Sequence, residues 1–149
     1  MLDNTFVIVH INNTSKNRMI LGTDTVILDN ELFVVTNNPM VWEILSSRCE
    51  VRYFDVPLED VLRCVRDLVH KGHKLLTHPL SGSVKPKETM YKSIALSKDI
   101  GPLDEEGVSL IENCVGICES FEDKRKKSLD LKTQKDFQLI DLSLISSIF

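Results

Sequence analysis

The chain has 149 residues, of which 42% are hydrophobic and 27% are charged, a balance typical of one globular domain rather than of a disordered chain. The formal net charge of −4 argues against a general nucleic-acid-binding protein, because neutralising phosphates needs a net basic face. The apolar runs are too short to span a bilayer and no secretory signal precedes them, so we expect a cytoplasmic protein that does not bind membranes.

The first 30 residues come before any regular alternation of strands and helices. Two apolar runs, Phe6–Ile11 and Met19–Leu28, flank a polar segment and could pair as a hairpin. The alternative is a loosely attached extension. We therefore predict an N-terminal extension at residues 1–30, followed by a single α/β domain at residues 31–149.

Strand and helix patterns alternate through the rest of the chain. Short apolar runs that end in turn residues predict four strands, at residues 31–36, 50–54, 74–78 and 91–97. Helical periodicity predicts four helices, at residues 40–47, 58–71, 105–121 and 137–149. The last segment also shows some alternation typical of a strand. The strongest helix carries its apolar residues on one face, at Leu58, Val61, Leu62, Val65, Leu68 and Val69.

This order of elements predicts a small three-layer α/β fold. Strand–helix–strand units with short loops imply right-handed crossovers and a mainly parallel sheet between helices. We expect the strand at 31–36 in the middle of the sheet, with 50–54 and 74–78 on either side. In such sheets, ligands bind beyond the carboxyl ends of the strands, where the strand order reverses.

Polar residues follow two of these strands. Asn37 and Asn38 come after the first strand, and His78 and Ser81 come after the third. Because we expect those strands to be neighbours, we predict that these four side chains share one cleft.

The most informative stretch is the loop at residues 78–87. Prolines stiffen both of its ends, and Gly82 permits a positive φ angle and a close approach of the backbone to a ligand. The side chains that could contact a small anion are Ser81, Ser83, Lys85 and Lys87. Such a cluster could hold a phosphate or a carboxylate. The alternative is an ordinary turn-rich loop.

Charge is unevenly distributed along the chain. Between His70 and Lys98 there are six lysines and one acid, a local charge of +5 in a chain of net charge −4. A local positive field on an acidic protein suits a small anion better than a polymer. Lysines are also ordinary surface residues, so a solvated surface remains the alternative.

More specific chemistry finds little support in the sequence. No Gly-x-Gly occurs, so neither the dinucleotide fingerprint nor the P-loop is present, and no Gly-x-Ser-x-Gly elbow supports a hydrolase. Three histidines could suggest a metal, but His70 and His73 bracket a helix end while His78 ends a strand. We therefore expect no cofactor and no metal. The four cysteines form no Cys-x-x-Cys pair and are expected to be free thiols.

Three strings of the chain closely resemble the GrdX family: residues 36–39, residues 65–67 and the continuous string His70–Pro86. These are small bacterial proteins encoded beside components of the glycine, sarcosine and betaine reductases of amino-acid-fermenting clostridia. The likeness covers residues 32–121 and does not include residues 1–30. It implies a cytoplasmic setting in an anaerobic bacterium and an association with reductase chemistry, but it supplies no catalytic residue.

Three functional hypotheses follow. The leading one is a non-catalytic accessory protein that binds a small anion or a reductase component, with the expected ligand-binding residues Asn37, Asn38, His78, Ser81, Gly82, Ser83 and Lys85. The second is an enzyme acting on a small carboxylate or phosphate, with His78 as general acid–base and Asn37 or Asn38 orienting the substrate. The third is an assembly protein that forms a homodimer through Phe137–Phe149.

Overall fold

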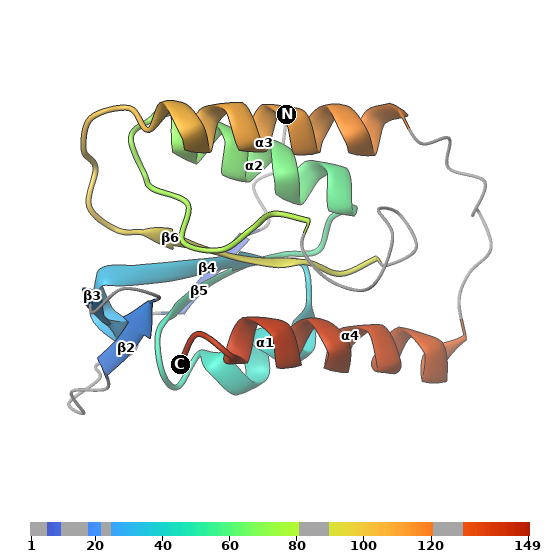
Figure 1. Cartoon of the computed structure of the whole chain (residues 1–149). Coiled ribbons are helices and arrows are strands. Elements are labelled where there is room, and N and C mark those ends of the chain that lie inside the picture. The colour runs from blue at the N-terminus through green and yellow to red at the C-terminus, as the bar shows by residue number, and fades with distance from the viewer. Residues whose placement is uncertain (1–5, 10–17, 22–24, 81–89, 121–129) are drawn as a thin grey trace.

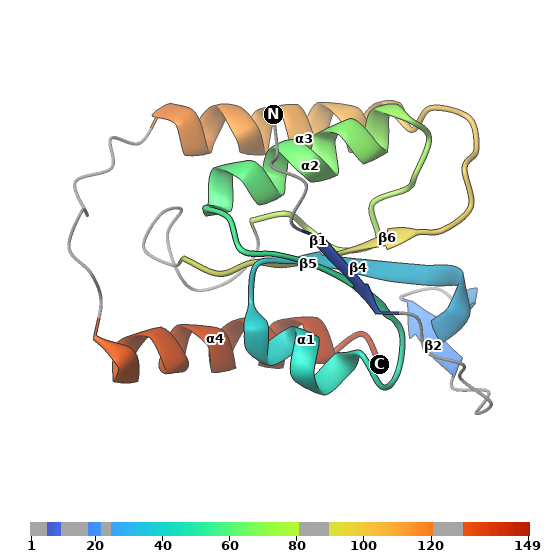
Figure 2. The ribbon, with the colours of Figure 1, turned by 180° about the vertical axis from the view of Figure 1, so that it is seen from behind.

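A computed structural model describes residues 6–9, 18–21, 25–80, 90–120 and 130–149. Its main sheet lies between two layers of helices (Figures 1 and 2). One face is covered by α2 (Leu58–His70) and α3 (Glu105–Ser120), and the other by α1 (Pro39–Leu45) and α4 (Leu131–Ser146). The three-layer α/β architecture is confirmed.

The main sheet has the order β1-β5-β4-β6. Its strands are β1 (Phe6–Val9), β4 (Leu32–Thr36), β5 (Glu50–Phe54) and β6 (Ser93–Ser97). The β4–β5 pair is parallel, whereas β1 runs antiparallel to β5 and β6 runs antiparallel to β4. A separate two-stranded sheet, β2 (Arg18–Leu21) with β3 (Thr25–Leu28), and a short 3₁₀ turn at Asp29–Glu31 precede β4.

The prediction of a mainly parallel sheet is wrong, because the segment 74–78 does not form a full strand. It makes one isolated bridge, from Leu75 to Leu96 of β6, and runs antiparallel to β6. β6 is antiparallel both to β4 and to this segment, so the sheet is mixed rather than mainly parallel. β6 lies beside β4, and the segment 74–77 lies beside β6 on the side away from β4.

The N-terminal region also pairs differently from the expected hairpin. β1 joins the main sheet, with Phe6 opposite Phe54 of β5. The second apolar run pairs with itself as β2 and β3. The three residues between these strands, Gly22-Thr23-Asp24, are of types that favour turns, which is the local signal for that break.

The predicted helices are confirmed, with one boundary shifted. Asn38 caps α1, where its side-chain oxygen accepts a hydrogen bond from the Met40 amide, and Pro39 occupies the first helical position as expected. α4 begins six residues earlier than the sequence predicted. Asp130 caps it by accepting a 2.7 Å hydrogen bond from the Thr133 amide, which fixes the first turn there.

Each face of the sheet has its own hydrophobic core. Alternate residues of the fully buried strand β4 point to opposite faces, so that Phe33 contributes to one core and Val34 to the other. The core under α2 and α3 consists of Phe33, Val35, Phe54, Leu58, Val61, Leu62, Val65, Val69, Ile94, Leu96, Ile111, Val115 and Cys118. The core over α1 and α4 consists of Leu32, Val34, Val41, Leu45, Cys49, Val51, Ala95, Leu142 and Ile145.

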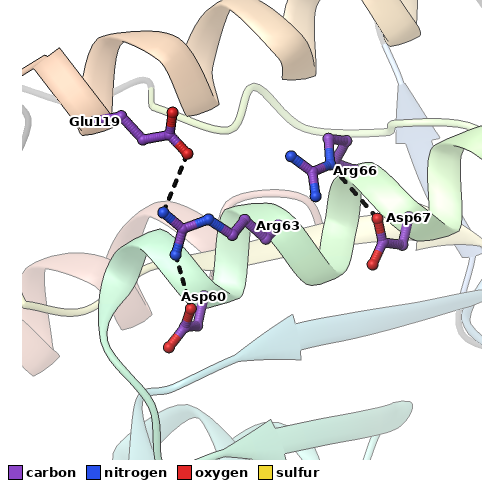
Figure 3. A network of polar contacts seen from close by, with 5 residues as sticks. All are labelled: Asp60, Arg63, Arg66, Asp67 and Glu119. Carbon is purple, nitrogen blue, oxygen red and sulfur yellow. Dashed lines mark hydrogen bonds and ion pairs between the residues drawn. The ribbon is translucent and has the colours of Figure 1, made fainter. Parts of the chain in front are cut away.

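Ion pairs connect the outer surfaces of α2 and α3. Arg63 donates to Glu119 on the neighbouring helix at 3.1 Å and to Asp60 on its own helix at 2.9 Å (Figure 3). Two turns further along α2, His70 Nε2 lies 2.9 Å from Glu112 Oε1. These pairs match an antiparallel arrangement of the two helices. They are solvent-exposed, and such pairs contribute only about 0–1 kcal/mol each.

Candidate functional site

Polar residues that the sequence singled out lie along one edge of the sheet, by which we mean a row of strand ends and not an edge strand. β4 and β5 end at this edge and β6 begins there, because β6 is antiparallel to both. Thr36, the last residue of β4, lies opposite Ser93, the first residue of β6. Their hydroxyl oxygens are 2.7 Å apart in a buried hydrogen bond.

A buried carboxylate on α4 lies against this pair of strands. Asp141 Oδ1 accepts a hydrogen bond from the Ser93 amide at 2.9 Å, and Asp141 Oδ2 accepts from the Ser93 hydroxyl at 2.7 Å. Asn38 donates to the same Oδ2 at 3.0 Å. We call Thr36, Asn38, Ser93 and Asp141 the Asp141 cluster. None of its members is more than 4% exposed, so α4 is attached to the sheet by hydrogen bonds shielded from water.

Asn38 uses its side chain to join two helices. Its amide nitrogen donates to the Gln138 carbonyl at 2.9 Å as well as to Asp141, both on α4. Its side-chain oxygen accepts from Met40 at the start of α1 at 3.0 Å. Both side-chain N–H groups therefore have protein acceptors, which leaves only acceptor capacity on the oxygen for a ligand.

Asn37 holds three segments of the chain together. Its amide nitrogen donates to the Val56 carbonyl at 3.0 Å and to the Met90 carbonyl at 2.7 Å. Its oxygen accepts from the Lys92 amide at 3.0 Å. Val56 comes just before α2, and Met90 and Lys92 follow residues 81–89. Asn37 thus fixes the start of β6, where the chain re-enters the sheet after residues 78–87, which we call the lysine-rich loop.

Lys92, the residue before β6, is buried and only 7% exposed. Burial lowers its pKa below the ordinary value, while the negative charges of Asp141 and of ionised Cys114 act in the opposite direction. Burial likewise raises the pKa of the Cys114 thiol on α3. Lys92 therefore lies within the electrostatic reach of a group on each helical layer.

His78 lies at the same edge but not beside Asn37. The preceding residue, Thr77, accepts a hydrogen bond from the Ala95 amide of β6, and the exposed His78 ring accepts at Nδ1 from the Leu80 amide at 3.0 Å. The expectation that the two strands are neighbours is wrong, since β6 lies between them. Two strand spacings correspond to about 10 Å.

The remaining predicted ligand-binding residues, Ser81, Gly82, Ser83 and Lys85, lie outside the described residues, as does Lys87. Their roles therefore stay predictions.

The described lysines of residues 70–98 are divided between two edges of the sheet. Lys71 is the C-cap of α2, and the Lys74 carbonyl accepts from the Ser97 amide at the end of β6, so both lie away from the Asp141 cluster. Lys98 is 3.7 Å from Glu50. Among the described lysines of this stretch, Lys92 lies at the edge that carries Asn37, whose side-chain oxygen accepts from its amide.

Asp141 and Ser93 are not among the site residues predicted from the sequence. One signal was available, because Asp141 is a single acid in the apolar run Leu139–Ile145. An isolated carboxylate in such a run is typical of a buried hydrogen-bonded group. Its partners could not be identified, because Asn38 is 103 residues away in the chain.

The opposite edge carries a second buried acid that the sequence analysis did not single out. Glu50, 8% exposed, accepts from Arg52 Nε at 3.3 Å and lies near Lys98. The Arg52 guanidinium also covers the Phe33 ring at 3.8 Å, and the His73 ring meets that ring edge-on. His73 Nδ1 lies 2.7 Å from the Ser97 carbonyl, so this histidine has a structural partner.

The side chains do not suggest a metal centre. Within the described residues, no three His, Cys, Asp or Glu side chains come together in a way that could hold a metal ion. All four cysteines are free thiols, and Cys49, Cys114 and Cys118 are buried. In the same part of the chain, no helix has the length and apolar content needed to cross a membrane.

The fold and the site together define a small three-layer α/β protein with a mixed sheet and one hydrogen-bonded polar edge. Comparison with protein-family models then gives a direct assignment. The chain belongs to the family described as GrdX-like protein, whose model matches residues 33–149. Searches of curated proteins and of solved structures found no match.

Proposed function

We propose that this protein is a non-catalytic accessory protein of the glycine, sarcosine and betaine reductase system, which binds a small anion or a reductase component at residues 78–87. Membership of the GrdX-like family supports the association with that system. The proposed setting is the cytoplasm of an anaerobic bacterium.

The observation that carries this proposal is the set of hydrogen bonds made by Asn37. By holding Met90 and Lys92, this side chain anchors the carboxyl end of the lysine-rich loop to the end of β4. The other end of the loop follows Thr77, which is hydrogen-bonded to β6. A segment with both ends anchored loses less conformational entropy when it binds a ligand.

The hydrogen bonds of the two asparagines favour a supporting role for them. Each has both side-chain N–H groups bonded within the protein. The proposed contacts to an anion therefore come from the loop itself, through Ser81, Gly82, Ser83 and Lys85, with His78 at its start. Backbone N–H groups and lysine charge are the groups that suit a phosphate or a carboxylate.

Thermal unfolding with and without an anion tests the proposal. Inorganic phosphate and acetate, at matched ionic strength, are expected to raise the Tm of the parent protein, since a ligand at 100 times its Kd stabilises by about 2.7 kcal/mol. The double variant K85A/K87A is expected to lose this response. The control variant K71A/K74A removes the same charge from exposed positions at the opposite edge of the sheet and is expected to keep it.

Purified reductase components provide the second arm of the test. Sedimentation of the parent protein with each component is expected to reveal a complex that K85A/K87A weakens and K71A/K74A does not. The proposal is overturned if neither anion raises the Tm of the parent and no component forms a complex with it. An equal response of both double variants would also contradict it.

A further inference from the structure

We propose that a second copy of this chain packs against the outward side of α4. This surface, which we call the α4 outer face, consists of Leu139, Ile140, Ser143 and Leu144. The three apolar side chains are 58%, 40% and 43% exposed, respectively. Single exposed apolar residues are common on proteins, but three within six residues of one helix form a patch.

The pattern of α4 is that of a helix covered on two sides. Asp141, Leu142 and Ile145 are buried against the sheet and α1. Residues on the other side of the same turns are apolar as well. A helix that is apolar all round is typical of one that is buried all round. Among the described elements, α4 packs on one side against α1 and β6 (Figure 1).

The charge of this region favours a second copy as the occupant. From Phe137 to Phe149, the only ionisable side chain is Asp141, and it is buried. In the whole chain, by contrast, 27% of the residues are charged. Two copies of net charge −4 repel one another, so they associate most favourably through a face without charge. A two-fold axis lets the same uncharged face meet itself.

An antiparallel pairing of two α4 helices also matches their remaining charges. The exposed Lys132 and Lys135 lie in the first turns of α4. In an antiparallel pair, these lysines come close to the carboxyl end of the partner helix, where the helix dipole is negative. The first turns of α4 carry these two lysines and one exposed acid, Asp136, a net charge of +1, while the exposed side chains further along the helix are uncharged. An antiparallel pair therefore brings a net basic end to a negative helix end.

The surface can be extended by α1, which packs beside α4. Ile44 of α1 is 51% exposed. One helix with one neighbouring side chain gives an interface at the small end of the range for specific dimers, so we expect a dimer that dissociates on dilution.

Sedimentation equilibrium measures the association directly. The parent protein, whose chain mass is 17.0 kDa, is expected to shift toward twice that mass between about 5 and 500 μM, the range in which small interfaces associate. The variant I140E/L144E is expected to stay monomeric at all concentrations. The matched control I100E/L103E changes two exposed residues before α3 and is expected to dimerise like the parent.

Cross-linking keeps the test decisive if I140E/L144E does not fold. The exposed Ser143 lies on the α4 outer face, so S143C is expected to give covalent dimers with a short bis-maleimide. S109C, at an exposed position on α3, is the control and is expected to give none above the parent background. A monomeric parent, a dimeric I140E/L144E variant, or equal cross-linking of S143C and S109C overturns the proposal.

Discussion

The two helical layers are attached to the same sheet in different ways. Under α2 and α3, the helices bury only apolar side chains in the core, and Arg52 and His73 contact it at Phe33. The ion pairs that join these helices lie at the solvent-exposed surface. Over α1 and α4, the apolar core is smaller and the buried Asp141 cluster lies beside it. One layer is held mainly by burial of apolar area, and the other also by hydrogen bonds with fixed directions.

This difference bears on how precisely each layer is positioned. Apolar burial is non-directional and tolerates small shifts of a helix. The Asp141 cluster does not, because its carboxylate must meet Ser93 and Asn38 at hydrogen-bond distance. Asn38 also caps α1, so the position of α4 is coupled to the start of α1.

The largest expected effect comes from removing the carboxylate of this cluster. D141A leaves the Ser93 amide, the Ser93 hydroxyl and one Asn38 N–H without their acceptor. We therefore expect the free energy of unfolding to fall by about 3–5 kcal/mol. Urea unfolding measures the change. D136A, on an exposed turn of the same helix, should change stability by less than about 0.5 kcal/mol. Similar values for the two variants would refute a specific role for the cluster.

Truncating a core side chain on the other face of the sheet should lower stability slightly less than D141A does. Leu62 is fully buried between α2 and the sheet, so L62A is expected to lower the free energy of unfolding by about 2–5 kcal/mol through lost burial and a cavity. L142A, at the margin of the α4 core with 9% exposure, should fall near the lower end of that range. A larger loss for L142A would reverse the comparison between the two layers.

Two substitutions of Asn38 separate its capping role from its role in the cluster. N38A loses the cap and the bonds to α4, and we expect a loss of about 2 kcal/mol in urea unfolding. Aspartate caps helices as well as asparagine does, yet N38D places a second carboxylate against Asp141. We therefore expect N38D to be the less stable variant at neutral pH. The opposite order would show that capping alone matters.

The smallest effect is expected for the exposed ion pairs on α2 and α3. R63A removes the contacts with Asp60 and Glu119 and should cost about 0.2–1 kcal/mol, less at high salt because exposed charges are screened. Thermal unfolding at low and high ionic strength measures this. A loss as large as that of L62A would mean that this layer also depends on directed polar contacts.

Features that depend on local sequence could be predicted. The spacing of Val61, Leu62 and Val65 specifies α2, and Asn38-Pro39 specifies the start of α1, because helix periodicity and capping involve residues a few positions apart. The strand β4 was also evident from its continuous apolar run. The family resemblance through residues 70–86 is confirmed by the family match.

Features that depend on distant pairing could not be predicted. The apolar pattern of Ser93–Ser97 marks a strand but does not say that it enters the sheet between β4 and the segment 74–77. Nor does the run Phe6–Val9 specify β5 as its partner. The site shows the same limit, because Asn37 and Asn38 were identified while Asp141, which pairs with Asn38, was not.

The register of β4 has a consequence for the order in which the chain folds. Val34 pairs with Val51 of β5, 17 residues further on, and with Ala95 of β6, 61 residues further on. Closing the longer loop costs about 1 kcal/mol more chain entropy, by the logarithmic dependence on loop length. We therefore expect the unit β4–α1–β5 to form early in folding and β6 to be added later. Mutations in β4–α1–β5 should then give the folding φ-values of about 0.5–0.8 that are typical of a folding nucleus. The Asp141 cluster, which needs β6 in place, would then be among the last contacts to form.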